Sequence, residues 1–344
     1  MRNPKKNTLR QKIAAADCPV MMYELIPPGK ELDNGSGLAY ARCAMDLVNS
    51  ARISIDAINI PDIRDEMQNG QKRVAGYEVK TDPREFVSLL RQASSAPLDF
   101  VINRATVYDD VASQQRWFSD THKHYGVSNV VLVGGESSLI QYPGPSVRET
   151  AELLHAQFPQ SFFCGGITIP TRRKPDSASD EPVRLISKAE QGMEFFTSQV
   201  LYEAKSICLL LKDYQVLCEQ KDKQPKRIFL SFAPVSTRKD LEFLKWLGVS
   251  VPQSIEQELF EANIGTGWRS VKITKAILQE VLSFVYSNRI QVPLGLNIEH
   301  ITRHNFELSK ELIEALGGIY AQTYSPTSAL ARQADDSEMP LHLR

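Results

Sequence analysis

The feature that most constrains this chain is a regular alternation of short apolar runs with amphipathic helical segments along most of its 344 residues. Several of these runs are apolar on both faces, which is typical of parallel strands that are covered on each side. The pattern predicts eight strands, at residues 20–26, 53–60, 98–104, 129–135, 162–169, 194–201, 228–233 and 293–299.

The segments between these runs carry helix signals. Val147, Ala151 and Leu154 fall at i, i+4 and i+7, which places one apolar stripe along a predicted helix. Asp82 followed by a proline predicts another helix start, with Asp82 as the N-cap and the proline at the first helical position.

Eight strands alternating with helices predict an α/β fold, a (β/α)8 TIM barrel that forms a single domain over residues 19–322. We expect residues 1–18 to be a peripheral N-terminal extension and residues 323–344 to be a poorly ordered polar tail. An open doubly wound sheet is the alternative. Its first strand would lead into a glycine-rich fingerprint, whereas Ile26 is followed by Pro27, Pro28 and Gly29.

Charge and cysteine usage narrow the functional classes. Lys and Arg number 40 against 41 Asp and Glu, so no basic field favours a nucleic-acid or membrane partner. No apolar run approaches the roughly 18 residues of a membrane span, and no apolar signal-peptide stretch follows the basic start. The five scattered cysteines include no C-x-x-C pair, which predicts free, buried or partly buried thiols, no metal site and a cytoplasmic location.

In a barrel of this kind the active site lies at the carboxyl ends of the strands, so polar residues there are the candidates. Glu24 is a lone carboxyl in an apolar strand, and we expect burial to raise its pKa toward that of a proton donor. A structural carboxylate paired with an arginine is an equal alternative. The other strand-end candidates are Gly134, Gly135, Glu136, Thr197, Ser198, Gln199, Asn297, Glu299 and His300.

Three of these positions suggest ligand contacts. The Gly134-Gly135 pair would let a ligand approach the backbone closely, and Glu136 would accept a hydrogen bond from that ligand. Gln199 would read a heterocycle through its side-chain amide. A tight strand-to-helix turn and a buried, satisfied glutamine are the plainer alternatives.

Several of these segments together resemble the methylenetetrahydrofolate reductase family, over roughly residues 19–320. Tyr-Glu-Leu-Ile-Pro-Pro at 23–28 resembles the family's first-strand signature. Asn-Val-Val-Leu-Val-Gly-Gly-Glu at 129–136 resembles its fourth strand, and 188–199 resembles the helix and sixth strand that lead to its Thr-Gln pair. The eighth-strand segment Gly-Leu-Asn-Ile-Glu-His at 295–300 resembles a divergent branch.

The resemblance implies a barrel that reduces 5,10-methylenetetrahydrofolate to 5-methyltetrahydrofolate with NADH or NADPH, through FAD. Glu24 would be the acid that helps to open the methylene bridge, Gln199 would hydrogen-bond the pterin, and Glu136 would lie near the flavin and folate rings. A small-molecule folate is the implied partner, and a homo-oligomer is compatible with the resemblance. The cofactor-binding positions of the family fall on Gly134, Gly135, Glu136, Glu181, Arg184 and Lys188.

The sequence also departs from the family pattern. Gly134 stands where the family commonly has Arg, Glu136 where it has Asp, and Ile169 where it has Tyr. These changes keep two alternatives open: a flavin-independent reductase that takes hydride directly from NADH, and a non-redox folate-binding or methyl-transferring subunit. A non-catalytic scaffold, whose strand-end polar groups are satisfied by loops, is the third alternative.

Overall fold

The computed structural model describes residues 8–31, 34–65, 67–68, 71–72, 77–94, 97–135, 140–261, 265–300 and 305–323, and it confirms the predicted (β/α)8 barrel. Eight parallel strands hydrogen-bond into a closed ring, and each predicted run overlaps one of them. In ring order they are β1 (Met21–Glu24), β2 (Ala57–Pro61), β5 (Asp99–Ala105), β6 (Asn129–Val133), β7 (Phe163–Thr168), β8 (Phe195–Val200), β9 (Arg227–Phe232) and β10 (Leu294–Glu299).

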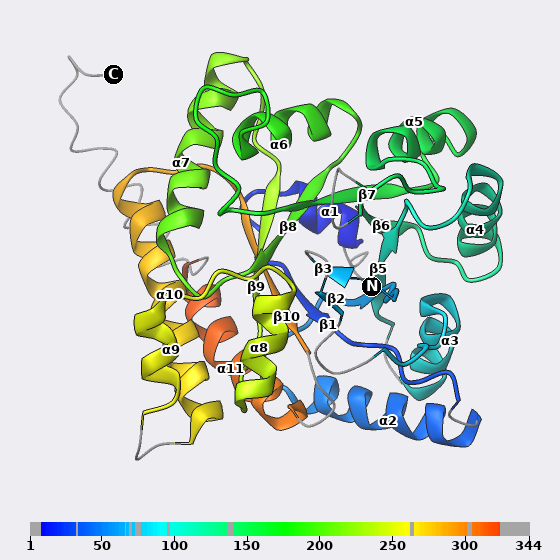
Figure 1. Ribbon diagram of the computed structural model, residues 1–344, viewed down its shortest axis with the longest axis horizontal. Coiled ribbons are helices and arrows are strands. Elements are labelled where there is room, and N and C mark those ends of the chain that lie inside the picture. The colour runs from blue at the N-terminus through cyan, green and yellow to red at the C-terminus, as the bar shows by residue number, and fades with distance from the viewer. Residues whose placement is uncertain are drawn as a thin grey trace, which may run out of the picture.

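Helices connect the strands and lie around the outside of the ring (Figure 1). A short antiparallel pair, β3 (Met67–Gln68) and β4 (Gln71–Lys72), forms a separate sheet. The outer helices are α2 (Asn34–Ser50), α3 (Pro83–Ala93), α4 (Val111–Lys123), α5 (Val147–Gln157), α6 (Glu181–Glu190), α7 (Lys205–Gln220), α8 (Arg238–Trp246), α9 (Gln253–Leu259), α10 (Thr266–Ser287) and α11 (Phe306–Thr323).

Local signals in the sequence fix where several helices begin. Asp82 is the N-cap of α3 and accepts a hydrogen bond from the backbone N–H of Arg84, as predicted. Ser146 and Glu149 form a reciprocal capping box at the start of α5, and the predicted apolar stripe of this helix buries Ala151 and Leu154. Caps of this kind satisfy backbone donors that a helix cannot satisfy internally.

Side-chain alternation divides the core into two parts. Outward-facing strand residues pack under the surrounding helices, whereas inward-facing residues fill the lower part of the barrel. Phe195 lies at the centre of the inner part, stacked on Phe163 at 5.4 Å and edge-on to Phe229 at 5.7 Å between ring centroids. The barrel interior is therefore a packed core rather than a channel.

The amino ends of the strands are closed by α1 (Leu9–Ala14). Leu9 and Ile13, one turn apart, are buried in the inner cluster. The guanidinium of Arg227, which is 2% exposed, donates to the carbonyl of Ile13 at 3.0 Å and to that of Ala15. The backbone N–H of Leu9 donates to the Asp99 carboxylate at 3.2 Å.

The expectation that residues 1–18 are peripheral is therefore wrong for α1. Two apolar side chains four residues apart give a short helix one buried face, and the open lower end of a barrel provides the complementary surface. The first seven residues, and the predicted polar tail from residue 324 onward, lie outside the described residues.

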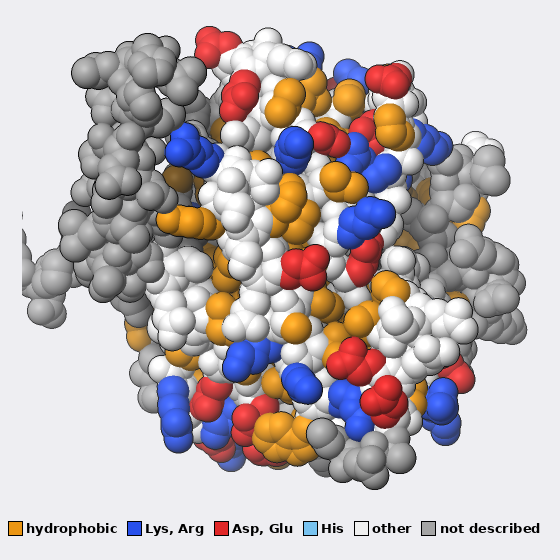
Figure 2. Space-filling view, turned by 90° about the vertical axis from the view of Figure 1, so that its left-hand side faces the viewer, with side chains coloured by type: hydrophobic (Ala, Val, Ile, Leu, Met, Phe, Trp, Pro, Cys, Tyr) orange, Lys and Arg blue, Asp and Glu red, His pale blue; other side chains and the backbone are white. Residues whose placement is uncertain are grey.

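The surface is chemically mixed. On the face drawn in Figure 2, Lys and Arg side chains alternate with Asp and Glu, so its coloured part shows no broad area of one sign. Among the described residues, no helix is long and apolar enough to cross a membrane. The five cysteines are free thiols, but Cys43 is exposed rather than buried or partly buried as predicted.

We predict that Ile13→Ala lowers the free energy of unfolding by about 2–4 kcal/mol, because it leaves a cavity in the inner cluster. Urea unfolding followed by circular dichroism measures the change. Ile140→Ala is the control, since Ile140 is 43% exposed and its truncation should change stability by less than about 0.5 kcal/mol. Equal effects of the two changes would show that α1 does not close the barrel.

Candidate functional site

The carboxyl ends of the strands carry a ring of polar side chains on the inner face of the barrel. Residues two apart in a strand point to the same side. Met22, Ala57 and Val101 lie in the apolar inner cluster, and the residue two positions further along each of these strands is polar. This mouth ring comprises Glu24, Asn59, Asn103, Thr197, Ser231, Asn297 and Glu299.

Glu24 is held by two amides from the neighbouring strands. Its Oε2 accepts hydrogen bonds from Asn59 Nδ2 at 2.8 Å and from Asn103 Nδ2 at 3.2 Å. Burial, and then the nearby Glu299 carboxyl, raise the pKa of Glu24 well above its ordinary value of 4.5. Among the described residues no arginine or lysine forms a salt bridge with Glu24, and its role as an acid stays a prediction.

Glu299 is the second carboxyl of the mouth ring. It is the register partner of Glu24 across the β1–β10 pair. Asn297 Nδ2 donates to Glu299 Oε1 at 3.2 Å and to Ser231 Oγ at 3.1 Å. Burial raises the pKa of Glu299 to about 7, against the opposing effect of its hydrogen bonds.

The mouth ring also contains buried acceptors that nothing in the described chain satisfies. The side-chain oxygens of Asn59, Asn103 and Asn297 have no hydrogen-bond partner, and the same holds for the Thr197 hydroxyl. A buried polar atom without a partner is costly, so a donor from outside the described residues is expected there. Three amide oxygens beside two carboxyls suit a ligand rich in N–H groups.

Gln199 lies at the end of β8, where the register with β9 shifts between Thr197 and Val200. Its Nε2 donates to the Leu247 carbonyl at 3.0 Å, and its Oε1 accepts from the Val200 backbone N–H at 3.0 Å. The side chain therefore ties β8 to the end of α8. Its predicted contact with a pterin stays a prediction.

The Gly134-Gly135 turn follows β6, as predicted, but packing inside the chain already requires one of its glycines. A Cβ on Gly135 would lie 2.3 Å from the ring of Tyr142, and Tyr142 contacts Tyr108 edge-on. The close approach that glycine permits here is therefore made by Tyr142. Glu136, the predicted ligand contact, lies outside the described residues.

Glu181, Arg184 and Lys188 do lie together, at the junction of β7 and α6. The fully buried Glu181 carboxylate accepts hydrogen bonds from Thr168 Oγ1 and the Ile169 N–H, each at 3.0 Å, and Arg184 Nε lies 3.5 Å from it. Lys188 donates to a backbone carbonyl of β7, and burial lowers the pKa of its ammonium to about 8. Glu181 Oε1 and Lys188 thus bind the chain itself, whereas Glu181 Oε2 and Arg184 Nε have no hydrogen-bond partner among the described residues. The flavin-contacting role that the resemblance implies for the trio stays a prediction.

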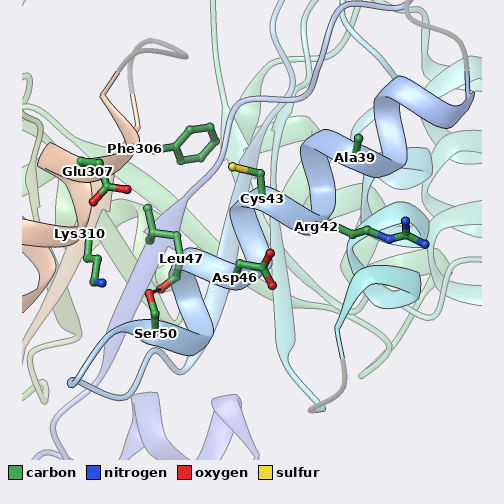
Figure 3. A pocket seen from close by; sticks show the side chains of 9 residues that line it. All are labelled: Ala39, Arg42, Cys43, Asp46, Leu47, Ser50, Phe306, Glu307 and Lys310. Carbon is green, nitrogen blue, oxygen red and sulfur yellow. Dashed lines mark hydrogen bonds between the residues drawn. The ribbon is translucent and has the colours of Figure 1, made fainter.

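A surface cavity of about 540 Å³ lies between α2 and α11, on the outside of the barrel (Figure 3). Figure 3 shows Phe306 of α11 on one side of it and Cys43 of α2 on the other. No member of the mouth ring lines it. The lining residues are Ala39, Arg42, Cys43, Asp46, Leu47, Ser50, Phe306, Glu307 and Lys310.

A second cavity, also of about 540 Å³, lies beside the ends of β2 and β5. The buried Arg104 there pairs with Asp62 at 2.7 Å and Asp109 at 2.6 Å, and it lies over the Trp117 ring at 4.5 Å. These pairs hold together the loops that follow β2 and β5, the strands that carry Asn59 and Asn103. No cluster of three potential metal ligands occurs in the described part of the chain.

The sequence singled out Glu24, whereas Asn59, Asn103 and Ser231 were not among the candidates, and Asn297 and Glu299 were candidates without a role. The alternation of side chains along a strand would have identified Asn59, Asn103 and Ser231. Each is a polar residue placed two positions after an inward-facing apolar one, near the end of an otherwise apolar strand. That signal needs the inward face to be known, which a strand apolar on both faces does not reveal.

Comparison with known proteins supports the fold. No known protein family and no curated protein matches the sequence. Among solved structures, an uncharacterized protein from Clostridium thermocellum that binds two copies of 5-methyl-5,6,7,8-tetrahydrofolic acid matches with a TM-score of 0.74 at 21% identity, over 90% of this chain and 99% of that one. At this identity the likeness shows the fold alone.

Two further structures match more weakly. The Bacillus cereus spore cortex-lytic enzyme SleL has a TM-score of 0.45 at 8% identity, over 86% of this chain and 74% of its own. A GH18 chitinase from Pseudoalteromonas aurantia has a TM-score of 0.46 at 12% identity, over 86% of this chain and all of its own. Likeness at this level carries no argument about function.

We predict that Lys188→Met changes the pH dependence of stability. Wild-type Lys188 has a folded-state pKa of about 8, against an ordinary value of 10.5. Between these two pH values the unfolded chain therefore binds one more proton than the folded chain does. Wild-type stability should therefore rise with pH across that window, by at most about 3 kcal/mol, and the variant should lack this rise. Urea midpoints at pH 7.5, 9 and 10 measure it, with the exposed Lys239→Met as control. A wild-type-like rise in Lys188→Met would contradict the assignment.

Proposed function

We propose that this protein binds a reduced folate at the mouth ring and acts as a methylenetetrahydrofolate reductase. The observation that carries the proposal is the set of buried amide oxygens without donors, on Asn59, Asn103 and Asn297, around the raised-pKa carboxyl of Glu24. The described ring thus combines hydrogen-bond acceptors for a heterocycle with an acid for its chemistry.

Recognition would follow from the donor pattern of the ligand. A tetrahydropterin presents N–H groups at its 2-amino group, N3 and N8, and amide oxygens are suitable acceptors for them. Fully oxidised pterins lack the N8 hydrogen, so a ring of acceptors favours the reduced form. The fold likeness to a protein that binds 5-methyltetrahydrofolic acid supports the choice of a folate as the ligand.

The acid step is assigned to Glu24. In its protonated form Glu24 donates its proton to N10 of 5,10-methylenetetrahydrofolate as the bond between the methylene carbon and N10 breaks. The positive charge then resides on the N5 iminium, and Glu24 is left as a carboxylate. Asn59 Nδ2 and Asn103 Nδ2, which already donate to its Oε2, stabilise that carboxylate.

Reduced nicotinamide is the proposed source of the hydride, which adds to the iminium carbon and gives the 5-methyl group. We propose direct transfer rather than transfer through FAD. Glu181 Oε1 and Lys188 are bound within the chain, which leaves Glu181 Oε2 and Arg184 Nε as the remaining groups of the trio without hydrogen-bond partners among the described residues. The competing proposal is a folate-binding protein without a redox step, since the mouth ring accounts for binding alone equally well.

We predict that Glu24→Gln lowers the rate of methylenetetrahydrofolate reduction at least about 100-fold, because the amide cannot deliver the proton. Binding of 5-methyltetrahydrofolate, measured by calorimetry, should change little. NADH oxidation, assayed with and without added FAD, gives the rate. Glu152→Gln, on the exposed face of α5, is the matched control.

Reduction by wild type without FAD would support direct transfer from NADH. Full activity in Glu24→Gln would remove the acid role. Folate binding by a wild-type protein that is inactive under every condition would favour the non-redox alternative.

We predict that Asn297→Leu weakens binding of 5-methyltetrahydrofolate about tenfold, because an acceptor for a ligand N–H is lost at similar volume. Wild type should also bind the reduced folate more tightly than folic acid. Calorimetric titration of both ligands measures these differences. Asn129→Leu, at the amino end of β6, is a control with no expected effect. Equal affinity of wild type for folic acid and the reduced folate would contradict an acceptor-based site.

A further inference from the structure

The mouth ring contains a carboxyl that the proposed acid step does not use. Glu299 lies opposite Glu24 in the register of two hydrogen-bonded parallel strands, where neighbouring backbones are about 4.8 Å apart. The Asn297 amide hydrogen-bonds Glu299 and also acts on Glu24. The two carboxyls therefore share one polar environment.

The described residues supply no counter-charge to this pair. Neither Glu24 nor Glu299 takes part in a salt bridge in the described chain, and Asn59 and Ser231 on the flanking strands are uncharged. His300 stacks on Phe306 at 4.2 Å, away from the pair, and burial lowers its pKa to about 4.

The remaining ionisable groups near these strands are engaged elsewhere. Tyr23 belongs to the outer core and meets His300 edge-on. Asp240 of α8 accepts hydrogen bonds from Ser236 and the Thr237 N–H. Glu24 is thus the ionisable group that faces Glu299 within the described part of the barrel.

We propose that Glu299 is a positioning residue for Glu24: the pair holds one proton and one negative charge, and the Glu299 charge keeps the proton on Glu24. Two neighbouring carboxylates without a cation repel each other, so ionising both is strongly disfavoured. When Glu24 gives its proton to a ligand, the pair carries two negative charges beside the newly formed cation. Delivery of that proton to a folate rests on the proposed function, whereas sharing of the proton in the free protein does not.

The test is infrared difference spectroscopy of the ligand-free protein over a pH series. The protonated-carboxyl band of Glu24 is identified by its loss in Glu24→Gln. In Glu299→Gln the band should disappear at a pH lower than in wild type by about one unit or more, because the like charge is gone. Glu299→Asp keeps the charge and should titrate close to wild type.

Glu194→Gln is the matched control. Glu194 lies at the amino end of β8, paired with Lys226 at 2.7 Å, and its loss should leave the Glu24 band in place. Where reduction is measurable, the alkaline limb of its pH profile should move with the band in Glu299→Gln.

An unmoved band in Glu299→Gln would overturn the inference, and so would an equal shift in Glu299→Asp, which would indicate altered packing rather than charge. The infrared titration needs no ligand. A shifted band together with absent folate binding would therefore overturn the proposed function alone.

Discussion

The structure depends on one geometric constraint: in a closed barrel every second side chain of each strand points inward. The layers toward the amino ends of the strands are filled by apolar residues and closed by α1, whose Leu9 and Ile13 belong to the inner cluster. Polar side chains on the inner face therefore lie at the two ends of the strands: Asp99 and Arg227 bind α1 at the amino end, and the mouth ring occupies the carboxyl end. Asn59 and Asn103, although they come from different strands, consequently meet the same carboxyl of Glu24.

Burial of two carboxyls side by side makes this site costly for the fold. Both Glu24 and Glu299 have raised pKa values, so their ionisation works against the folded state as pH rises from about 4.5 through the folded-state values. The apolar layers of the barrel interior and the side-chain caps of α3, α4, α5 and α8 offset this cost. A site with two carboxyls of raised pKa is thus maintained by the rest of the chain.

Much of the fold was predictable because its signals are local. The strand runs are short and strongly apolar, and Asp82 with the following proline marks the start of α3 without reference to the rest of the chain. The role of α1 was not predictable in this way, since Arg227 binds its carbonyls across more than 200 residues of sequence. The contact of the Lys188 ammonium with a carbonyl of β7 was likewise not predictable, because only the fold brings the two together.

The candidate site was predictable only in part, because only some of its signals are local. A single carboxyl in an apolar strand singled out Glu24, but its partners depend on which face of each strand is inward. The register of β1 with β10, which places Glu299 beside Glu24, is a property of barrel closure rather than of either segment.

The most direct test of the central claim is a crystal structure of the protein with 5-methyltetrahydrofolate. The account predicts the pterin at the mouth ring, with its N–H groups within hydrogen-bond distance of the side-chain oxygens of Asn59, Asn103 and Asn297. Folate bound instead in the cavity between α2 and α11, or beside the ends of β2 and β5, with the mouth ring unchanged, would contradict it.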